Sequence, residues 1–384
     1  MTYVQGSSLR FRKLLVVIKQ TAYEEYSQLK LRGQAPKALR WNRLESRYKA
    51  HKQCVNDLLA SLRHHKVDFL CVNRVELDRQ HLSNVDLVVA VGGDGTVLSA
   101  SHFLDHGTIP LLGINSDPIT RDESKSVKNK SADERRSHGA LCACTSNDMH
   151  RGLSRILYGG GHLSSRTRIQ CVLKTTFTET RLVPTLNDML ICNPSPAAVS
   201  RFRMGWLEEN HYPQEEEEDR LTTTSDMGSL SEPTQLYKPP TLNHYGTITR
   251  FGGQSYDVQK SINVWSSGMW VSTSTGSTAA IKNSGGQVME RDSSDLQYLI
   301  REHMIEADAD NDVQTIGNKP LRDGEKLHLR WNSHRGKVFI DGSHMTHDLS
   351  LGDELLITGD APPLQLFLRE DGDENTDAMG LSTA

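Results

Sequence analysis

The segment 86–101, DLVVAVGGDGTVLSAS, constrains the fold more strongly than any other part of the 384-residue chain. Its first half is a continuous apolar run, which is typical of a strand buried on both faces of a parallel sheet. The run passes directly into the turn Gly92-Gly93-Asp94-Gly95-Thr96, and a helix-like pattern follows. Open α/β sheets bind ligands at the carboxyl ends of their strands. The segment therefore predicts a ligand-binding turn, where glycines admit a ligand close to the backbone and the helix start favours phosphate.

The same turn has a simpler interpretation, in which Asp94 only caps the helix that follows it. Gly-Asp-Gly is common in turns, so this alternative stays open for the turn taken alone. The turn is not a P-loop, because the Lys and the four-residue gap of that motif are missing, and it does not match GxGxxG either.

Strand and helix patterns alternate through residues 1–165. Apolar strand-like runs occur at 13–19, 67–73, 85–93 and 109–116, and helical spacing occurs at 37–64. This alternation predicts an N-terminal α/β domain with a Rossmann-like parallel sheet. Residues 166–345 consist instead of strand-like segments separated by turn residues, which predicts a β-rich, mostly antiparallel and sandwich-like C-terminal domain.

Three segments are polar and lack any periodicity. We expect a mobile insertion at 116–137 and a disordered acidic insertion at 208–240, which is also rich in Ser, Thr and Pro. A docking role for the run EEEED in the second insertion is the alternative. Residues 369–384 are expected to form a disordered tail.

Composition excludes several classes of function. With 44 Lys and Arg against 48 Asp and Glu, the net charge of −4 offers no electrostatic basis for binding nucleic acid. No apolar run approaches the roughly 20 residues that span a membrane. The apolar run at 14–18 is too short for a signal peptide, and six cysteines make no disulfide scaffold, so a cytoplasmic location is expected. Arg10, Arg12 and Lys13 leave an organellar transit peptide as the alternative.

Two further stretches carry polar side chains at expected strand ends. Residues 266–286, SSGMWVSTSTGSTAAIKNSGG, again predict a strand, a turn of small residues and a helix start, although a capped Ser/Thr-rich turn would look the same. In LNDMLICNP, Asn187 and Asp188 stand at the head of a strand. An Asn beside an acid is suited to bind a base edge and a ribose hydroxyl together.

Taken together and in this order, GGDGT, ND and TGSTA resemble the NAD kinase family. The stretches GINSDP, SGGQVMERDSSDLQYLIRE and VFIDGSHMTHDLSLGDELLITGDAPPLQLFL are similar to its plant-type NADH kinase branch. The resemblance implies an N-terminal α/β domain, a β-rich C-terminal domain, and a segment at 346–368 that returns to the first domain. It also implies an active site between the domains and a homodimer.

The resemblance further implies transfer of the ATP γ-phosphate to the adenosine 2′-hydroxyl of NADH, NAD⁺ or both. Asp94 would be the general base, which fits the need of an alcohol for a carboxylate that takes its proton. Mg²⁺ would arrive with ATP, because no dedicated acidic metal cluster is visible. The phosphates would be surrounded by Gly93, Gly95 and Thr96. The substrate nucleoside would be held by Asn187 and Asp188, and the nucleotide pocket lined by Thr275, Gly276, Ser277, Thr278 and Ala279.

Three positions depart from the commoner family pattern. Asn187-Asp188 replaces Asn-Glu, Ala280 replaces an aromatic residue, and Ser267 replaces an Asp that lies towards the nicotinamide end of the substrate. NAD⁺ carries a cationic ring and NADH a neutral one. The loss of a nearby carboxylate weakens Coulomb attraction for the cation, so Ser267 favours NADH.

Two other functions remain as alternatives. Diacylglycerol and sphingosine kinases share a GGDGT turn, but the sequence shows no amphipathic helix suited to a membrane surface. The second alternative is a catalytically inactive sensor that binds NAD(H), because one wall of the pocket differs from the family pattern.

Overall fold

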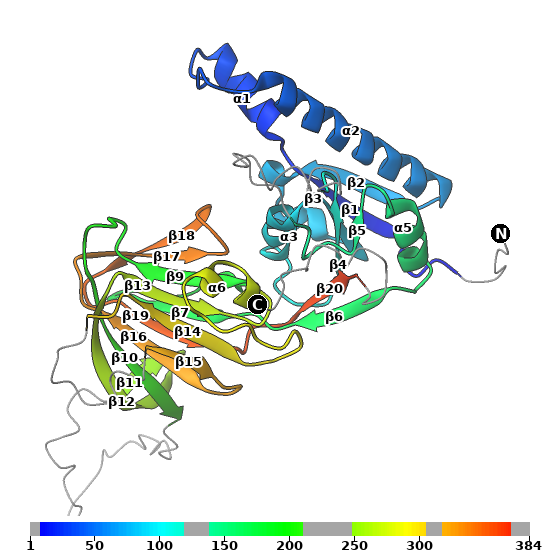
Figure 1. Cartoon of the computed structure of the whole chain (residues 1–384). Coiled ribbons are helices and arrows are strands. Elements are labelled where there is room, and N and C mark those ends of the chain that lie inside the picture. Colours follow the sequence, from blue (N-terminus) through cyan, green and yellow to red (C-terminus); the bar gives the residue numbers. More distant parts are fainter. Residues whose placement is uncertain (1–7, 119–137, 210–247, 305–316, 370–384) are drawn as a thin grey trace, which may run out of the picture.

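The computed structural model describes residues 8–118, 138–209, 248–304 and 317–369 (Figure 1). These residues form an N-terminal region around one sheet and a C-terminal region built from two sheets. The expected insertions at 116–137 and 208–240 fall almost entirely outside the described residues, and so does the expected tail at 369–384.

The N-terminal sheet is parallel except at one edge. Its strands follow the order β2-β1-β3-β4-β20-β6, with β5 paired to β4, and only β20 and β6 are antiparallel. The bounds are β1 Lys13–Ile18, β2 Asp68–Asn73, β3 Leu87–Gly92, β4 Leu111–Asn115, β5 Cys144–Thr145, β6 His162–Arg166 and β20 Leu364–Leu368. The predicted parallel α/β sheet is confirmed.

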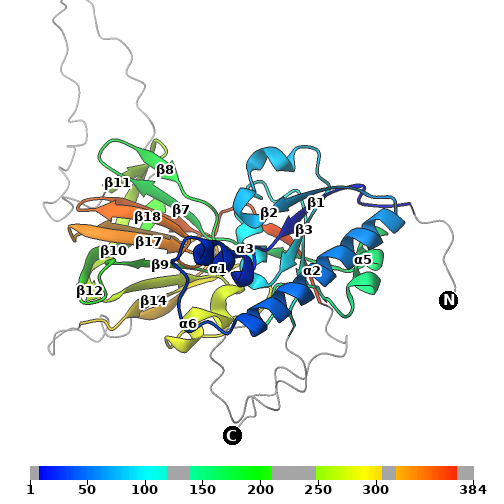
Figure 2. The same ribbon diagram turned by 90° about the horizontal axis from the view of Figure 1, so that it is seen from above.

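The continuous apolar run of β3 supplies both faces of this sheet. Val89 and Val91 pack with α2 (Trp41–His64) and α5 (Met149–Leu157), which lie side by side on one face (Figure 2). Val88 and Ala90 join the other cluster, together with α3 (Asp94–Ser101). Burial on both faces is therefore confirmed for β3. It is wrong for the strand expected at 67–73, because β2 lies at the sheet edge and is mostly exposed.

The C-terminal region is a sandwich of two antiparallel sheets, with strand orders β11-β12-β10-β16-β19-β7-β8 and β15-β14-β13-β9-β17-β18. One core fills the space between them and includes Phe202 and Trp331 from the first sheet and Met189 and Tyr298 from the second. The predicted antiparallel, sandwich-like region is confirmed. The bounds are β7 Gln170–Lys174, β8 Glu179–Arg181, β9 Asp188–Cys192, β10 Ser200–Glu209, β11 Ile248–Phe251, β12 Gln254–Ser266, β13 Gly268–Ser272, β14 Leu296–Arg301, β15 Asn318–Leu321, β16 Lys326–Trp331, β17 Arg335–Ile340, β18 Met345–Ser350 and β19 Glu354–Thr358.

Short helices complete the described chain. Helix α1 precedes α2, and single helical turns follow β2 and β13. The bounds are α1 Ala22–Leu31, η1 Arg74–Glu76, η2 Arg79–Leu82, η5 Gly276–Thr278 and α6 Ala280–Asn283.

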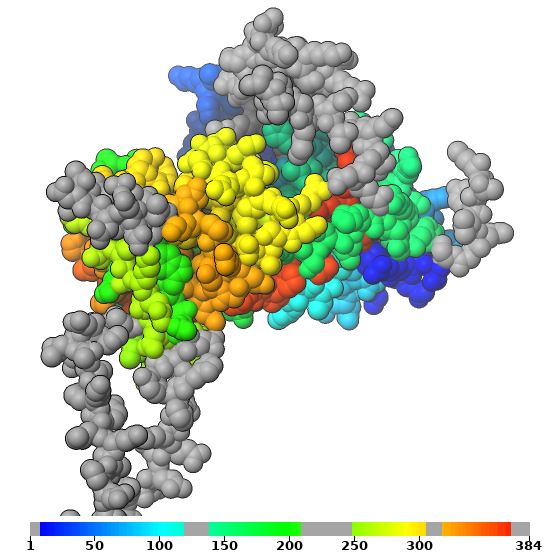
Figure 3. All heavy atoms as spheres, turned by 60° about the horizontal axis from the view of Figure 1, so that its bottom comes forward, coloured from blue at the N-terminus to red at the C-terminus, as the bar shows by residue number. Residues whose placement is uncertain are grey.

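Only the last strand returns to the N-terminal sheet. The segment 346–368 was expected to return as a whole, but β18 and β19 pair within the sandwich and bury Leu349, Leu355 and Ile357 in its core. Strand β20 alone crosses over and pairs with β4 and β6. In Figure 3, the yellow and orange atoms of the C-terminal region directly adjoin the green and red atoms near β6 and β20. The two regions therefore meet over a packed surface.

The core under α2 gives a test of this packing. Leu58 is fully buried against the sheet, whereas Leu31 at the end of α1 is 90% exposed. We expect Leu58→Ala to reduce the free energy of unfolding by about 2–5 kcal/mol, because a buried cavity replaces the side chain. Leu31→Ala should change it by less than about 0.5 kcal/mol. Urea unfolding followed by circular dichroism measures both, and equal effects of the two substitutions would contradict the described packing.

Candidate active site

Asp94 is the first residue of α3 and lies at the carboxyl end of β3. Gly93 is the N-cap residue and makes no side-chain capping bond. The Asp94 carboxylate instead accepts hydrogen bonds from another segment: Oδ2 accepts from the Gly139 N–H at 3.1 Å and Oδ1 from the Leu141 N–H at 2.8 Å. The interpretation of Asp94 as a simple helix cap is therefore wrong. Two backbone amides orient a half-buried carboxylate at the sheet edge.

Two glycines of the turn, Gly92 and Gly95, differ in the space around their Cα atoms. A Cβ on Gly92 would lie 2.3 Å from the Thr96 hydroxyl oxygen and 2.9 Å from Lys19 Cβ, so the fold itself requires this glycine. A Cβ on Gly95 would meet no protein atom within 4 Å. Gly95 is exposed and borders open space, while the Thr96 side chain is 2% exposed and packs inward on Gly92. Of the three residues predicted to surround the phosphates, Gly93 and Gly95 can bring backbone N–H groups close to a ligand. The side chain of Thr96 points into the protein and away from the open space beside the turn.

A cavity of about 160 Å³ lies beside the turn, at the carboxyl edge of the parallel sheet. Two of its lining residues are cationic: Lys19 directly follows β1, and Arg47 comes from α2 with its Nε 3.8 Å from Asp117 Oδ2. The full lining is Lys19, Thr21, Ala22, Tyr23, Leu44, Arg47, Tyr48, His51, Gly92, Gly93, Asn115, Ser116 and Asp117. A compact cavity with a glycine floor and two cations is suited to an anion such as a phosphate chain.

The histidine of this cavity adds no positive charge at neutral pH. His51 is 3% exposed, and burial lowers its pKa to about 4, with Lys19 contributing in the same direction. Its Nδ1 lies 2.8 Å from Ser116 Oγ, which ties α2 to the end of β4. Sequence reasoning missed Lys19, Arg47 and His51. Lys19 had a signal, since it follows a strand of the parallel sheet directly.

The ND and TGSTA motifs, far apart in sequence, meet in the C-terminal region. The Thr273 N–H donates to the Asn187 carbonyl at 3.0 Å, and Ser272 is paired with Asp188 across β13 and β9. A Cβ on Gly276 would lie 2.0 Å from the Asn187 carbonyl oxygen, so only glycine allows this approach. The two motifs therefore lie side by side in the C-terminal region.

The polar groups on this surface are suited to a ligand. Among the described residues, the buried Oδ1 of Asn187 has no hydrogen-bond partner. Burial, and secondarily the nearby Asp341, raises the pKa of Asp188 to about 7. An unsatisfied amide oxygen beside a half-protonated acid can accept and donate hydrogen bonds, which a nucleoside base and sugar would satisfy.

The hydroxyl groups of the TGSTA turn serve mainly the protein. Thr275 Oγ1 accepts from Arg166 Nε at 2.9 Å and Nη2 at 2.8 Å. Ser277 is fully buried, donates to the Ser274 carbonyl at 2.7 Å and accepts from the Met289 N–H at 3.1 Å. Both side chains therefore help to hold the turn. Ser277 is too deeply buried to line a pocket as expected, whereas the place of half-buried Thr275 in a pocket stays a prediction. Thr278 is exposed and Ala279 half-exposed, so these two remain available.

Ser267 lies apart from the other predicted residues. It precedes β13, whereas Asp188 pairs with Ser272 at the opposite end of that strand, so five residues at about 3.3 Å each separate them by roughly 16 Å. The Ser267 hydroxyl also donates to Glu302 Oε2. A carboxylate therefore remains at this position, and the argument that Ser267 removes a negative charge is wrong as stated.

Within the described ranges, no group of three or more His, Cys, Asp or Glu side chains is placed to hold a metal ion. None of the helices in this part of the chain is both long and apolar enough to cross a membrane.

The fold combines a parallel α/β region, which has a glycine turn at the carboxyl edge of its sheet, with an antiparallel β-sandwich. Residues 7–117 match the family described as ATP-NAD kinase N-terminal domain. The chain is 34% identical over 340 residues to "Probable NADH kinase" of Oryza sativa subsp. japonica, which covers 88% of this chain and 87% of that protein. It is 32% identical over 364 residues to "NADH kinase" of Arabidopsis thaliana, with 94% and 96% covered. The chain belongs to the NAD kinase family.

Two solved structures share the fold. The crystal structure of yeast NADH kinase complexed with NADH aligns with a TM-score of 0.56 at 12% identity, covering 98% of this chain and 90% of that one. The NAD kinase from Archaeoglobus fulgidus in complex with ATP aligns with a TM-score of 0.54 at 14% identity, covering 93% and 94%. The predicted fold class and the suspected family are both confirmed.

The contrast between Gly92 and Gly95 predicts two different effects of alanine. Gly95→Ala should leave the melting temperature unchanged or slightly higher, because Ala favours helix, and should weaken Mg-ATP binding at least tenfold by filling the space beside the turn. Gly92→Ala should lower the melting temperature, because its Cβ meets Thr96. Thermal unfolding and calorimetric titration measure the two effects. Normal ATP binding by Gly95→Ala would show that no ligand approaches there.

The raised pKa of Asp188 predicts that the free energy of unfolding depends on pH. Its pKa rises from 3.8 to about 7 on folding, so its contribution to stability is fully present below pH 3.8 and is lost as the pH rises through 7. We expect Asp188→Asn to stabilise the protein, and to do so by on the order of 2 kcal/mol more at pH 8 than at pH 5. Urea unfolding at both pH values tests this, and a gain independent of pH would refute it.

Proposed function

We propose that this protein is an ATP-dependent kinase that phosphorylates the adenosine 2′-hydroxyl of NADH, NAD⁺ or both, and produces NADPH and NADP⁺. Membership of the NAD kinase family and the relatives named NADH kinase support this proposal. The observation that carries it is Asp94, a carboxylate oriented by two backbone amides at the start of α3, beside a cation-lined cavity.

ATP would bind with its phosphates at the carboxyl edge of the parallel sheet. Gly93 and Gly95 supply bare backbone at a helix start, where N–H groups and the helix dipole favour an anion. Lys19 and Arg47 supply positive charge to the lining of the same cavity. Charge-assisted contacts of this kind are roughly twice as strong as neutral hydrogen bonds.

The dinucleotide would bind against the C-terminal region. The free Oδ1 of Asn187 would accept a hydrogen bond from the base, and Asp188 would bind a ribose hydroxyl. The exposed Thr278 and the half-exposed Ala279 would border the same pocket. Loss of an aromatic side chain at Ala280 leaves this border more open than the common family pattern.

The reaction needs an acid–base group and a fixed geometry. The 2′-hydroxyl oxygen would form a bond to the γ-phosphorus as the bond from that phosphorus to the β–γ bridging oxygen breaks, and ADP would leave. The hydroxyl proton would pass to Asp94, because an alcohol is a poor nucleophile without a base. Phosphoryl transfer otherwise depends on positioning and charge stabilisation, which the turn and the two cations provide.

Mg²⁺ would accompany ATP. The described residues offer no dedicated metal cluster, and Asp117 is the carboxylate in the cavity lining, where it faces Arg47. This fits a metal held mostly by phosphate oxygens and water, with at most one or two protein carboxylates. When bound, the ion would neutralise charge on the β- and γ-phosphates.

Three finer assignments belong to the same proposal. A preference for NADH is supported by the names of the plant relatives and no longer by Ser267. A cytoplasmic location suits the six free cysteines, of which Cys71 alone is exposed, with an organelle as the alternative. A homodimer rests on the family resemblance.

Replacement of the base gives the direct test. Asp94→Asn keeps the size of the side chain but cannot accept the proton, so kcat should fall by about 10²- to 10⁴-fold while NADH still binds. Wild type and variant should be assayed with Mg-ATP and NADH, NAD⁺, diacylglycerol or sphingosine as acceptor. Turnover of a lipid in place of a dinucleotide would favour the lipid-kinase alternative. A wild type that binds NADH but phosphorylates nothing would be a sensor.

A further inference from the structure

One buried carboxylate organises the segment proposed to hold the nucleoside. Asp341 follows β17 in the left-handed region, with φ of 48°, and its side chain is fully buried. Its Oδ1 accepts from the N–H groups of Asn187 at 2.7 Å and Asp188 at 3.2 Å, and its Oδ2 accepts from the Leu186 N–H at 3.0 Å. The Asp341 N–H in turn donates to the Asp188 carbonyl at 2.9 Å. The backbone of 186–188 is therefore wrapped around this one side chain.

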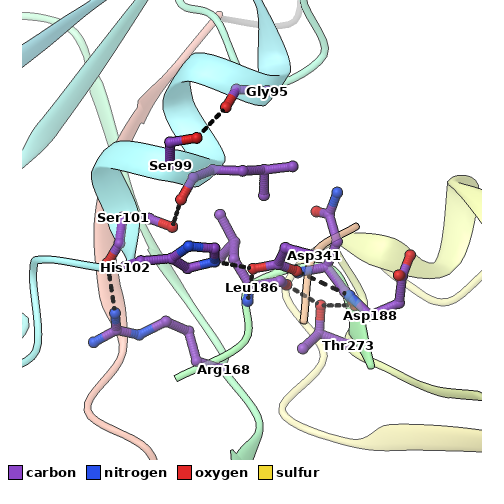
Figure 4. A network of polar contacts seen from close by, with 11 residues as sticks. Gly95, Ser99, Ser101, His102, Arg168, Leu186, Asp188, Thr273 and Asp341 are labelled. Atoms are coloured by element: carbon purple, nitrogen blue, oxygen red, sulfur yellow. Dashed lines mark hydrogen bonds and ion pairs between the residues drawn. The ribbon is translucent and has the colours of Figure 1, made fainter. Parts of the chain in front are cut away.

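The same carboxylate is bound from the other region of the protein. His102 is the C-cap residue of α3, and its Nε2 lies 2.8 Å from Asp341 Oδ2, with side-chain exposures of 2% and 0% (Figure 4). Helix α3 begins at Asp94 and ends at Ser101. The proposed base and the proposed nucleoside-holding pair thus belong to opposite ends of one continuous structure: a helix, a histidine, a carboxylate and three backbone amides.

The end of α3 is fixed by further buried contacts. Arg168 is fully buried and donates to the carbonyls of Ser101 at 3.3 Å, Leu104 at 3.0 Å and Pro362 at 2.7 Å. The ring of His344 stacks on that of His102, with centroids 5.8 Å apart. His102 therefore cannot shift without disturbing several buried polar groups, and its bond to Asp341 has a defined geometry.

We propose that His102 and Asp341 are positioning residues, which set the distance between Asp94 and the hydroxyl it deprotonates across the boundary between the two regions. Neither residue touches the substrate in this proposal, which rests on the proposed kinase function. Misplacement by about 1 Å at a reacting centre can reduce a rate by about 100-fold. Loss of the His102 bond would let 186–188 and α3 move relative to each other without altering the ATP cavity.

The test separates positioning from mere stability. His102→Leu removes the donor, whereas His102→Gln can place an amide N–H near the position of Nε2. We expect His102→Leu to lower kcat with NADH by about 10- to 100-fold and to leave KM for ATP within about twofold of wild type. His102→Gln should recover most of kcat. Leu58→Ala, which destabilises the N-terminal core away from this contact, should keep a wild-type kcat when assayed well below its melting temperature.

Three results would contradict the positioning role of His102. A His102→Leu protein with a lower melting temperature but wild-type kcat and KM would overturn the positioning role and leave the kinase proposal intact. A fall in kcat that Leu58→Ala reproduces, or that His102→Gln does not rescue, would also overturn it. A wild-type protein that phosphorylates neither NADH nor NAD⁺ would overturn the proposed function, and this inference with it.

Discussion

The carboxylate of Asp341 receives three backbone N–H groups and one imidazole in a place that water does not reach. A buried charge is tolerated only when it is paired and hydrogen-bonded, and removal of one partner typically costs about 3–5 kcal/mol. Both sides of the domain boundary therefore depend on this one group. Its negative charge also contributes to the raised pKa of Asp188, so the organisation of the segment and its protonation have a common origin.

The parallel sheet determines where the rest of the site can form. The strands β1, β3 and β4 end at one edge, and Lys19, the glycine turn and Ser116 follow them directly. Helix α2 closes this edge with Arg47 and His51. The sandwich presents the ND and TGSTA motifs towards α3, which lies between the two regions in both Figure 1 and Figure 2. In the proposed function, the donor site and the acceptor site therefore come from different regions of the chain.

The sequence predicted those features that depend on local pattern. The apolar run, the glycine turn and the helix start lie within 16 residues, so periodicity and turn chemistry were sufficient to predict β3 and α3. His51 had a partial signal, because it shares the buried stripe of α2 with Cys54, Val55 and Leu58. No local pattern could predict that His102 meets Asp341, since 239 residues separate them. The errors at Thr96, Ser277 and Ser267 have a related cause, because a motif does not show which way each side chain points or how far along a strand it lies.

Strand β20 has a consequence for synthesis of the chain. It is inserted between β4 and β6 and buries Phe367 against Phe11, whose ring centroid is 6.0 Å away. On the ribosome, β1, β3 and β4 emerge long before residues 364–368, so the part of the β4 edge at Leu111 and Leu112 stays unpaired while the whole sandwich is translated. Contacts of such large sequence separation form slowly, and open strand edges are prone to pair with other chains. The N-terminal region is therefore the first part to be synthesised and the last to be completed.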